Sequence, residues 1–335
     1  GEHFKAVVPS PVRHVADRIG QTRGNLLVTG VEMGGGPVTD ALRRRAAEAE
    51  VVMSPSAAAT LHHDMRRVQQ WGIVLADAER IDHLSGDVRY SAVTLGDVQP
   101  ERIARIVEGI GCPMAFDAVA LCAQDHGVAP AGQSHLDFRH NLFEEMLERS
   151  ARPHTLLFRA DEVPPAFSRL SAMARSARAL NAQEIYVMDS GMAAMVGAVQ
   201  DPRVQGEAPV MILDIATSHT VAAVMEGEQV AGYVEYHTRD ITLARLEALL
   251  RELADGQVRH DRILAEGGHG AYLRHAVGFG ALQAIIATGP KRGLLADSRL
   301  PITWGAPWGD NMMTGTVGLL ESLRRRKNLP DVNFV

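Results

Sequence analysis

Four histidines lie at the ends of predicted strands or in predicted turns, where their side chains could bind a metal ion. They are His126, His219, His237 and His269, among 14 histidines in the chain. Neutral imidazoles together with a carboxylate are a common ligand set for Zn²⁺, Fe²⁺ or Mn²⁺. With Asp214 or Asp125 as the carboxylate, such a set could activate a bound water. Because the chain has no HExxH or similarly tight spacing, this site requires the fold to bring distant residues together.

The turn that follows Asp214 could instead hold a phosphorylated ligand. The stretch "ILDIATSHT" reads as an apolar strand that stops at Asp214, whose carboxylate could orient Mg²⁺, followed by a turn of small and hydroxyl residues. Amides of such a turn can bind an anion, and neutral histidines are good donors to phosphate. The candidate ligand contacts are Thr217, Ser218, His219, Thr220, His269 and Lys291. Asp125, which ends another apolar strand, is the best candidate for a general base or a water-orienting carboxylate.

Two glycine-rich turns offer further places where a ligand could approach the backbone. Gly35 and Gly36 precede a predicted helix, and Gly267 and Gly268 lie in "RILAEGGHGAYLRHAV", which is predicted as a strand, a turn and a helix. Glycine permits close approach, and a helix N-terminus offers free N–H groups. Both turns are also compatible with ordinary tight connections, so the two interpretations stay open.

Other residue patterns favour structural roles. Arg139, in "HLDFRH", could bind an anion, but a solvated position in a loop is expected. The two cysteines, Cys112 and Cys122, cannot form an iron–sulfur cluster by themselves and do not have CxxC spacing. Cys122 lies in an apolar strand and is expected in the core. The sequence contains no GxSxG nucleophile elbow and no GxxxxGK[ST] phosphate loop.

Strands and helices alternate along the chain, which predicts an α/β fold. Strands are expected at 4–9, 25–30, 114–126 and 184–189 and as a meander over 210–238, and a helix is expected near the C-terminus at 310–327. The expected helix at 191–199 carries mostly small residues, which allow two helices to approach closely.

Length and composition are those of a soluble protein with two domains. The chain has 335 residues, of which 46% are apolar and 22% charged, and no apolar run is long enough to span a membrane. The formal charge, 34 − 40 = −6, does not suggest a nucleic-acid or anionic-membrane partner. Two cysteines and the lack of a visible signal peptide favour a reducing, cytoplasmic compartment.

The order of these segments resembles the actin-like ATPase superfamily, which includes sugar kinases and heat-shock chaperone ATPases. The shared order is a small-residue helix (190–199), a strand meander with an acid (210–238), a double-glycine turn before a helix (262–275) and a second small-residue helix (311–320). The resemblance implies a two-lobed, ribonuclease H-like α/β fold with an interdomain cleft. The lobes would be residues 1–188 and 189–325, with a tail at 326–335.

The same resemblance implies roles for particular residues. Asp214 would lie near the waters of Mg²⁺, and residues 216–220 would wrap the phosphates. Gly267 and Gly268 would pack against the adenosine, and the two small-residue helices would cross at a hinge.

Motifs spread over nearly the whole chain are similar to those of an uncharacterised prokaryotic family that is labelled pyruvate formate-lyase activating enzyme-like. They include "VVPSPV", "VTGVEMGGGP", "AQDHGVAP", "MDSGMAAMVGAV" and "GGHGAY". Members of that family begin with an additional strand and a "DIGxGTQD" turn, which would be the first phosphate loop. This hairpin is expected to be missing here, and Ala216, Thr217 and Ser218 stand where the superfamily has glycines.

These observations predict a cytoplasmic protein that binds a nucleotide or another small phosphorylated ligand. Its cofactor would be Mg-ATP or Mg-ADP, and its activity, if it is an enzyme, would be ATP hydrolysis or phosphoryl transfer. The first alternative is a metal-dependent enzyme or metal-binding protein that uses the histidines and a transition metal. The second is a non-catalytic scaffold of the same fold that acts through a protein partner.

Overall fold

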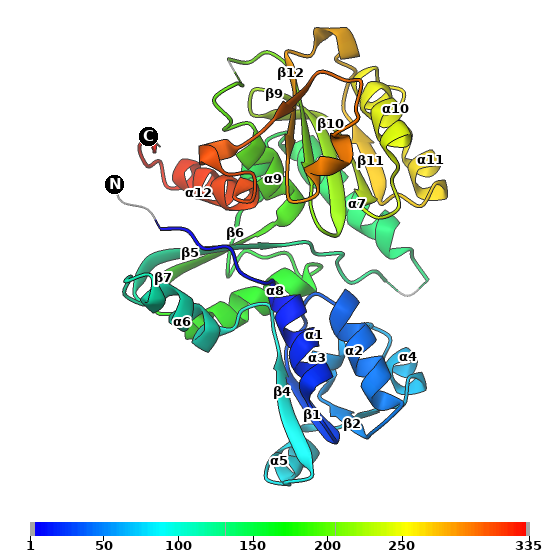
Figure 1. Cartoon of the computed structure of the whole chain (residues 1–335), viewed down its shortest axis with the longest axis vertical. Helices are drawn as coiled ribbons and strands as arrows, with labels where there is room; N and C mark the ends of the chain where they lie inside the picture. Colours follow the sequence, from blue (N-terminus) through cyan, green and yellow to red (C-terminus); the bar gives the residue numbers. More distant parts are fainter. Residues whose placement is uncertain (1–3, 131, 205, 333–335) are drawn as a thin grey trace. The chain divides into compact units, whose positions relative to one another are not determined.

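Helices and strands alternate along the chain, which confirms the predicted α/β class (Figure 1). The structure is a computed structural model, and it describes residues 4–130, 132–204 and 206–332. Two units each have more contacts within themselves than with the rest of the chain. The first comprises Gly1–Val119 and Glu162–Ile185, and the second comprises Ala120–Asp161 and Tyr186–Val335. The boundaries at 119 and 185 fall inside the strands β5 (Phe116–Ala123) and β7 (Ala182–Asp189).

The second unit contains residues 120–161, which the sequence assigned to the first lobe. Helix α7 (His135–Arg149) accounts for this difference, because it packs against strand β11 (Gly270–Leu273) of the second unit. The Tyr272 hydroxyl donates a hydrogen bond to the Glu148 carboxylate at 2.7 Å across this contact. The actin-like arrangement of two lobes around a cleft remains a prediction.

A parallel four-stranded sheet of order β3-β2-β1-β4 forms the centre of the first unit. Val28 pairs with Met53 on one side and Val93 on the other, and all three side chains are buried in the core, as is usual for parallel strands. The main elements are α1 (Pro11–Gln21), β1 (Asn25–Gly30), α2 (Gly36–Ala46), β2 (Val51–Met53), α3 (Pro55–Ala58), α4 (Met65–Gln70), β3 (Ile73–Leu75), α5 (Ala78–Ser85), β4 (Tyr90–Leu95), α6 (Pro100–Gly109) and α8 (Ser168–Ser176).

A mixed six-stranded sheet of order β11-β10-β9-β8-β12-β13 forms the centre of the second unit. Strands β8, β9 and β10 make the predicted antiparallel meander, and β12 and β13 extend the sheet in parallel with β8. Besides α7 and β11, the main elements are β6 (Phe158–Arg159), α9 (Ser190–Ala198), β8 (Val210–Ile215), β9 (His219–Glu226), β10 (Gln229–His237), α10 (Leu243–Ala254), α11 (His260–Ala265), β12 (Ala284–Thr288), β13 (Ile302–Trp304) and α12 (Thr314–Arg326).

Helix α10 covers one face of this sheet (Figure 1). Alternate residues of β8, namely Met211, Leu213 and Ile215, are buried in one apolar cluster with Leu246 and Leu250 of α10. The strand period of two and the helix period of 3.6 direct these side chains toward each other. This packing fixes the register of the meander, and therefore the positions of the residues at the strand ends.

The two small-residue helices, α9 and α12, contact each other as the sequence predicts. A Cβ atom at Gly197 would lie 1.8 Å from the Thr314 carbonyl oxygen, and one at Gly318 would lie 1.8 Å from the Ala193 carbonyl oxygen. Only glycine fits at either position, because the two backbones touch there.

Three local predictions were wrong. Residues 4–9 form no strand, because the segment ends in Pro9 and Pro11 already begins α1. The double-glycine turn has the helix α11 before it and the strand β11 after it, the reverse of the expected order. Arg139 lies on helix α7 and is only 5% exposed, so it is not in a solvated loop.

None of the helices in the described part of the chain combines the length and the apolar character that crossing a membrane requires.

Candidate metal site

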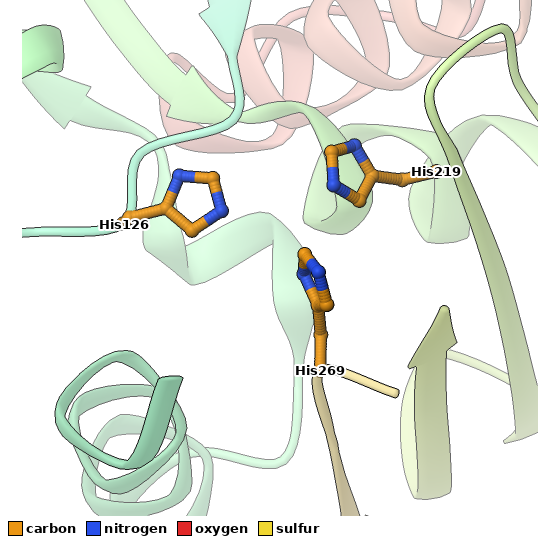
Figure 2. Close-up of side chains that lie close together, drawn as sticks. All are labelled: His126, His219 and His269. Atoms are coloured by element: carbon orange, nitrogen blue, oxygen red, sulfur yellow. The ribbon is translucent and has the colours of Figure 1, made fainter. Parts of the chain in front are cut away.

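Three histidines from separate segments of the second unit converge on one point (Figure 2). His126 lies in the loop after β5, His219 is the first residue of β9, and His269 directly precedes β11. One ring nitrogen from each lies within 4.8 Å of the other two. The convergence that the sequence interpretation required is therefore present for these three side chains.

Strand register brings the three histidines on the sheet together. His219 and His237 are direct partners in the β9–β10 ladder, and their ring centroids are 4.7 Å apart. Glu235 pairs with Gly270 in the β10–β11 ladder, so His269 lies beside the end of β10. The His237 and His269 ring centroids are 4.2 Å apart. We refer to His126, His219, His237 and His269 as the histidine cluster.

His126 completes the cluster from a loop that the buried Asp125 organises. The Asp125 carboxylate accepts a hydrogen bond from the Gly127 amide at 2.8 Å, and Gly127 has a φ of 70°, which favours glycine. The His126 ring centroid lies 6.1 Å from that of His219 and 5.8 Å from that of His269. Asp125 therefore shapes the loop that presents His126.

Burial keeps two of the histidines neutral. Burial and the neighbouring histidines lower the pKa of His219 to about 2. Burial and His237 lower the pKa of His269 to about 4. His219 Nε2 and His269 Nδ1 are buried nitrogen atoms without a hydrogen-bond partner among the described residues. Buried polar atoms are rarely left unpaired, and a neutral imidazole nitrogen is the form that binds a metal ion.

A buried group of charged residues lies behind the histidines. The Arg139 guanidinium pairs with Asp189 at 2.9 Å and with Glu235 at 3.2 Å. Burial acts to lower the pKa of Arg139, but the two carboxylates outweigh it and raise that pKa. Burial raises the pKa of Glu235 despite the nearby guanidinium. We call Arg139, Asp189 and Glu235 the arginine cluster.

Asp214 lies at the end of β8, next to the predicted phosphate-binding turn. The Thr288 hydroxyl donates a hydrogen bond to the Asp214 carboxylate at 3.0 Å, and burial raises the pKa of Asp214 to about 6. The Lys291 amide donates to the Ile215 carbonyl at 2.9 Å, which holds the loop after β12 against this turn.

The turn at 216–218 is partly closed by its own hydrogen bonds. The Ala216 amide donates to the His219 carbonyl at 3.0 Å, and the Thr238 amide donates to the Ser218 carbonyl at 2.9 Å. The Thr220 and Thr238 hydroxyls are 3.0 Å apart. The Ala216 amide and the Thr220 hydroxyl thus already have hydrogen-bond partners within the chain.

The glycine turns have clear packing roles. A Cβ at Gly268 would lie 2.6 Å from the Ile263 side chain, and Gly267 has a φ of 87°. In the first unit, a Cβ at Gly35 would lie 2.7 Å from the Thr60 carbonyl oxygen, whereas one at Gly36 would meet nothing within 4 Å. Gly268 and Gly35 are therefore required by contacts within the chain itself.

The sequence interpretation missed the arginine cluster. Glu235 lies in the apolar stretch "AGYVEYH", and Asp189 ends the apolar strand "EIYVMD". A charged residue in a buried apolar strand usually has a partner of opposite charge. The position of Glu235 in such a strand could therefore have revealed that it is paired. Arg139 gave no such signal, because its helix carries many polar residues.

Comparison with known proteins places the chain in a family. A family model described as "Putative pyruvate format-lyase activating enzyme (DUF1786)" matches residues 33–294, a segment that includes the whole histidine cluster. A search of curated proteins finds no match to the chain. Since the matched segment is well over half of the 335 residues, the chain belongs to the family that carries this description.

Proposed function

We propose that the protein is a metal-dependent enzyme that holds a divalent first-row transition metal in its histidine cluster. The observation that carries this proposal is the convergence of nitrogen atoms from His126, His219 and His269 within 4.8 Å of one another. A ligand set of imidazoles without thiolates suits Zn²⁺ or Fe²⁺. The unpaired buried Nε2 atom of His219 supports the same proposal, because a bound ion would satisfy it.

Three protein ligands favour a catalytic site over a purely structural one. Structural zinc sites are usually closed by four protein ligands, whereas catalytic sites keep a position open for water or substrate. When bound, the ion would supply Lewis-acid activation of that water or substrate. The chain would hold the ion through the three histidines, and Asp125 would keep the loop of His126 in place. His237, adjacent to both His219 and His269, would contact the ligand at the open position.

The family description itself does not fit the cysteines of this chain. A radical activating enzyme of that type uses a CxxxCxxC motif to hold an iron–sulfur cluster, and the chain has only Cys112 and Cys122. Two thiols ten residues apart cannot supply that motif. The proposal therefore rests on the histidine cluster and not on the description of the family.

Metal analysis of protein purified without a polyhistidine tag tests this proposal. We expect about one transition-metal ion per chain in the wild type, and a loss of that ion in His269→Ala and His219→Ala, because each variant removes a ligand. His83→Ala is the matched control, since His83 is an exposed histidine on α5. A wild type that stays metal-free after incubation with Zn²⁺ or Fe²⁺ contradicts the proposal.

A second candidate function is binding of a Mg-nucleotide at the turn after β8. Two observations favour it. Asp214 is the next-to-last residue of β8, the first strand of the meander, and the hydrogen bond from the Lys291 amide to the Ile215 carbonyl holds that lysine beside the turn. Asp214 would orient Mg²⁺, and Thr217 and Ser218 would contact phosphate.

Mg-ATP should then raise the melting temperature of the wild type, and Asp214→Asn should abolish the rise. An unchanged rise in the variant contradicts this candidate.

A further inference from the structure

The arginine cluster connects the loop of one metal-ligand candidate to the side chain of another. On one side, Arg139 Nη1 donates to the Asp125 carbonyl, and the Asp189 carboxylate accepts from the Asp125 amide at 3.3 Å. Both contacts hold the residue that directly precedes His126. On the other side, Arg139 Nη2 donates to Glu235 at 3.2 Å.

Glu235 in turn faces His269. Its Oε1 atom lies 3.9 Å from His269 Nδ1, and its carbonyl accepts a hydrogen bond from the His269 amide at 2.8 Å. Gln124 also donates to the Glu235 carboxylate, which fixes that side chain from a third direction. The distance to His269 Nδ1 is slightly too long for a hydrogen bond, and a small ring rotation would close it.

The charges of the cluster also indicate a cation nearby. Arg139 faces two carboxylates, and the exposed fractions are 5% for Arg139, 2% for Asp189 and 5% for Glu235. When both carboxylates are ionised they outnumber the single guanidinium, and the net negative charge that results is costly in a buried region. A metal ion in the adjacent histidine cluster would offset that charge.

We propose that Arg139 and Glu235 are positioning residues for the metal site, a proposal that rests on the proposed function. In the proposed site, the Glu235 carboxylate accepts a hydrogen bond from the Nδ1–H group of His269. The other ring nitrogen of His269 then binds the ion. Arg139 sets the separation between His126 and His269, because one rigid guanidinium holds both Glu235 and the Asp125 backbone. Residues that orient metal-binding histidines in this way typically change metal affinity roughly 10- to 100-fold when they are replaced.

Cobalt binding tests this proposal, because Co²⁺ can replace other divalent ions and its visible spectrum reports the ligand geometry. Untagged, metal-free protein would be titrated with Co²⁺, and urea unfolding of the metal-free protein would be measured in parallel. We expect Glu235→Gln to weaken Co²⁺ binding roughly 10- to 100-fold and to change the spectrum. Arg139→Lys keeps the charge but loses the fork of donors, and we expect weaker binding and a changed spectrum there as well.

The matched control is Glu226→Gln. Glu226 also pairs with a histidine, His275, at 2.6 Å, but lies outside both clusters. The Glu226→Gln variant should therefore bind Co²⁺ with the affinity and the visible spectrum of the wild type. Wild-type affinity and spectrum in both folded variants would overturn the positioning role while the proposed function stands. A wild type that binds no Co²⁺ would overturn the proposed function, and the positioning role with it.

Discussion

At the scale of single residues, burial controls the charge of several histidines, and its effect can be measured away from the metal site. His154 lies in the second unit near α12. Burial and the positive charges of Arg325 and Arg152 lower its pKa to about 4, against a smaller opposing effect of Glu321. The ordinary pKa of this side chain is 6.5. Between pH 6.5 and 4 the native protein therefore keeps the His154 imidazole neutral, whereas the same imidazole is protonated in the unfolded chain.

This difference predicts a loss of stability in acid. Above pH 6.5 His154 is neutral in both states and has no effect. As the pH falls from 6.5 toward 4, only the unfolded state takes up the proton, so the native state is destabilised. Because His154 is only half-buried, we expect a loss of about 1–2 kcal/mol, less than the full shift implies. Urea unfolding at pH 7.5 and 4.5 should show a smaller loss for His154→Gln than for the wild type.

The exposed His83 provides the control for this comparison. His83→Gln should lose as much stability in acid as the wild type does, because the side chain at position 83 is exposed to solvent in the native state as well as in the unfolded state. An identical acid loss in His154→Gln and the wild type would show that His154 is not kept neutral by the fold.

At the scale of elements, sequence-based prediction succeeded where local pattern determines the structure and failed where distant pairing decides. The small residues of "GMAAMVGAV" predicted close helix packing, and the contact at Gly197 confirms it. The stretch around Gly270 was predicted as a helix, yet it is strand β11, because β10 offers it a hydrogen-bonding partner. A short apolar segment does not distinguish the two states, so tertiary pairing decides between them.

The candidate site shows the same division. Each histidine of the cluster was identified from its place at a strand end or turn, but their convergence depends on the registers of β9, β10 and β11. The loop of His126 depends further on Arg139, which lies on a helix with no sequence signal of burial. Local pattern therefore identified the ligand candidates and missed the residues that hold them.

At the scale of the whole molecule, the two units divide the chemistry unequally. The complete histidine cluster, the arginine cluster and Asp214 belong to the second unit, while Gly35 and Gly36 belong to the first. Each unit has its own sheet and its own apolar core. A ligand that binds within one unit stabilises that unit directly.

Metal binding should therefore slow hydrogen exchange mainly in the second unit. A ligand at a hundred times its dissociation constant stabilises the folded form by about 2.7 kcal/mol, which corresponds to a roughly 100-fold slowing of amides that exchange through unfolding. With Zn²⁺ at that level, we expect such slowing in β9 and β10, which carry His219 and His237, and little change in β1 and β4 of the first unit. In His269→Ala the slowing should disappear. Equal slowing in both units would instead show that the two units unfold together. No slowing in β9 and β10 would contradict an ion held by the histidine cluster.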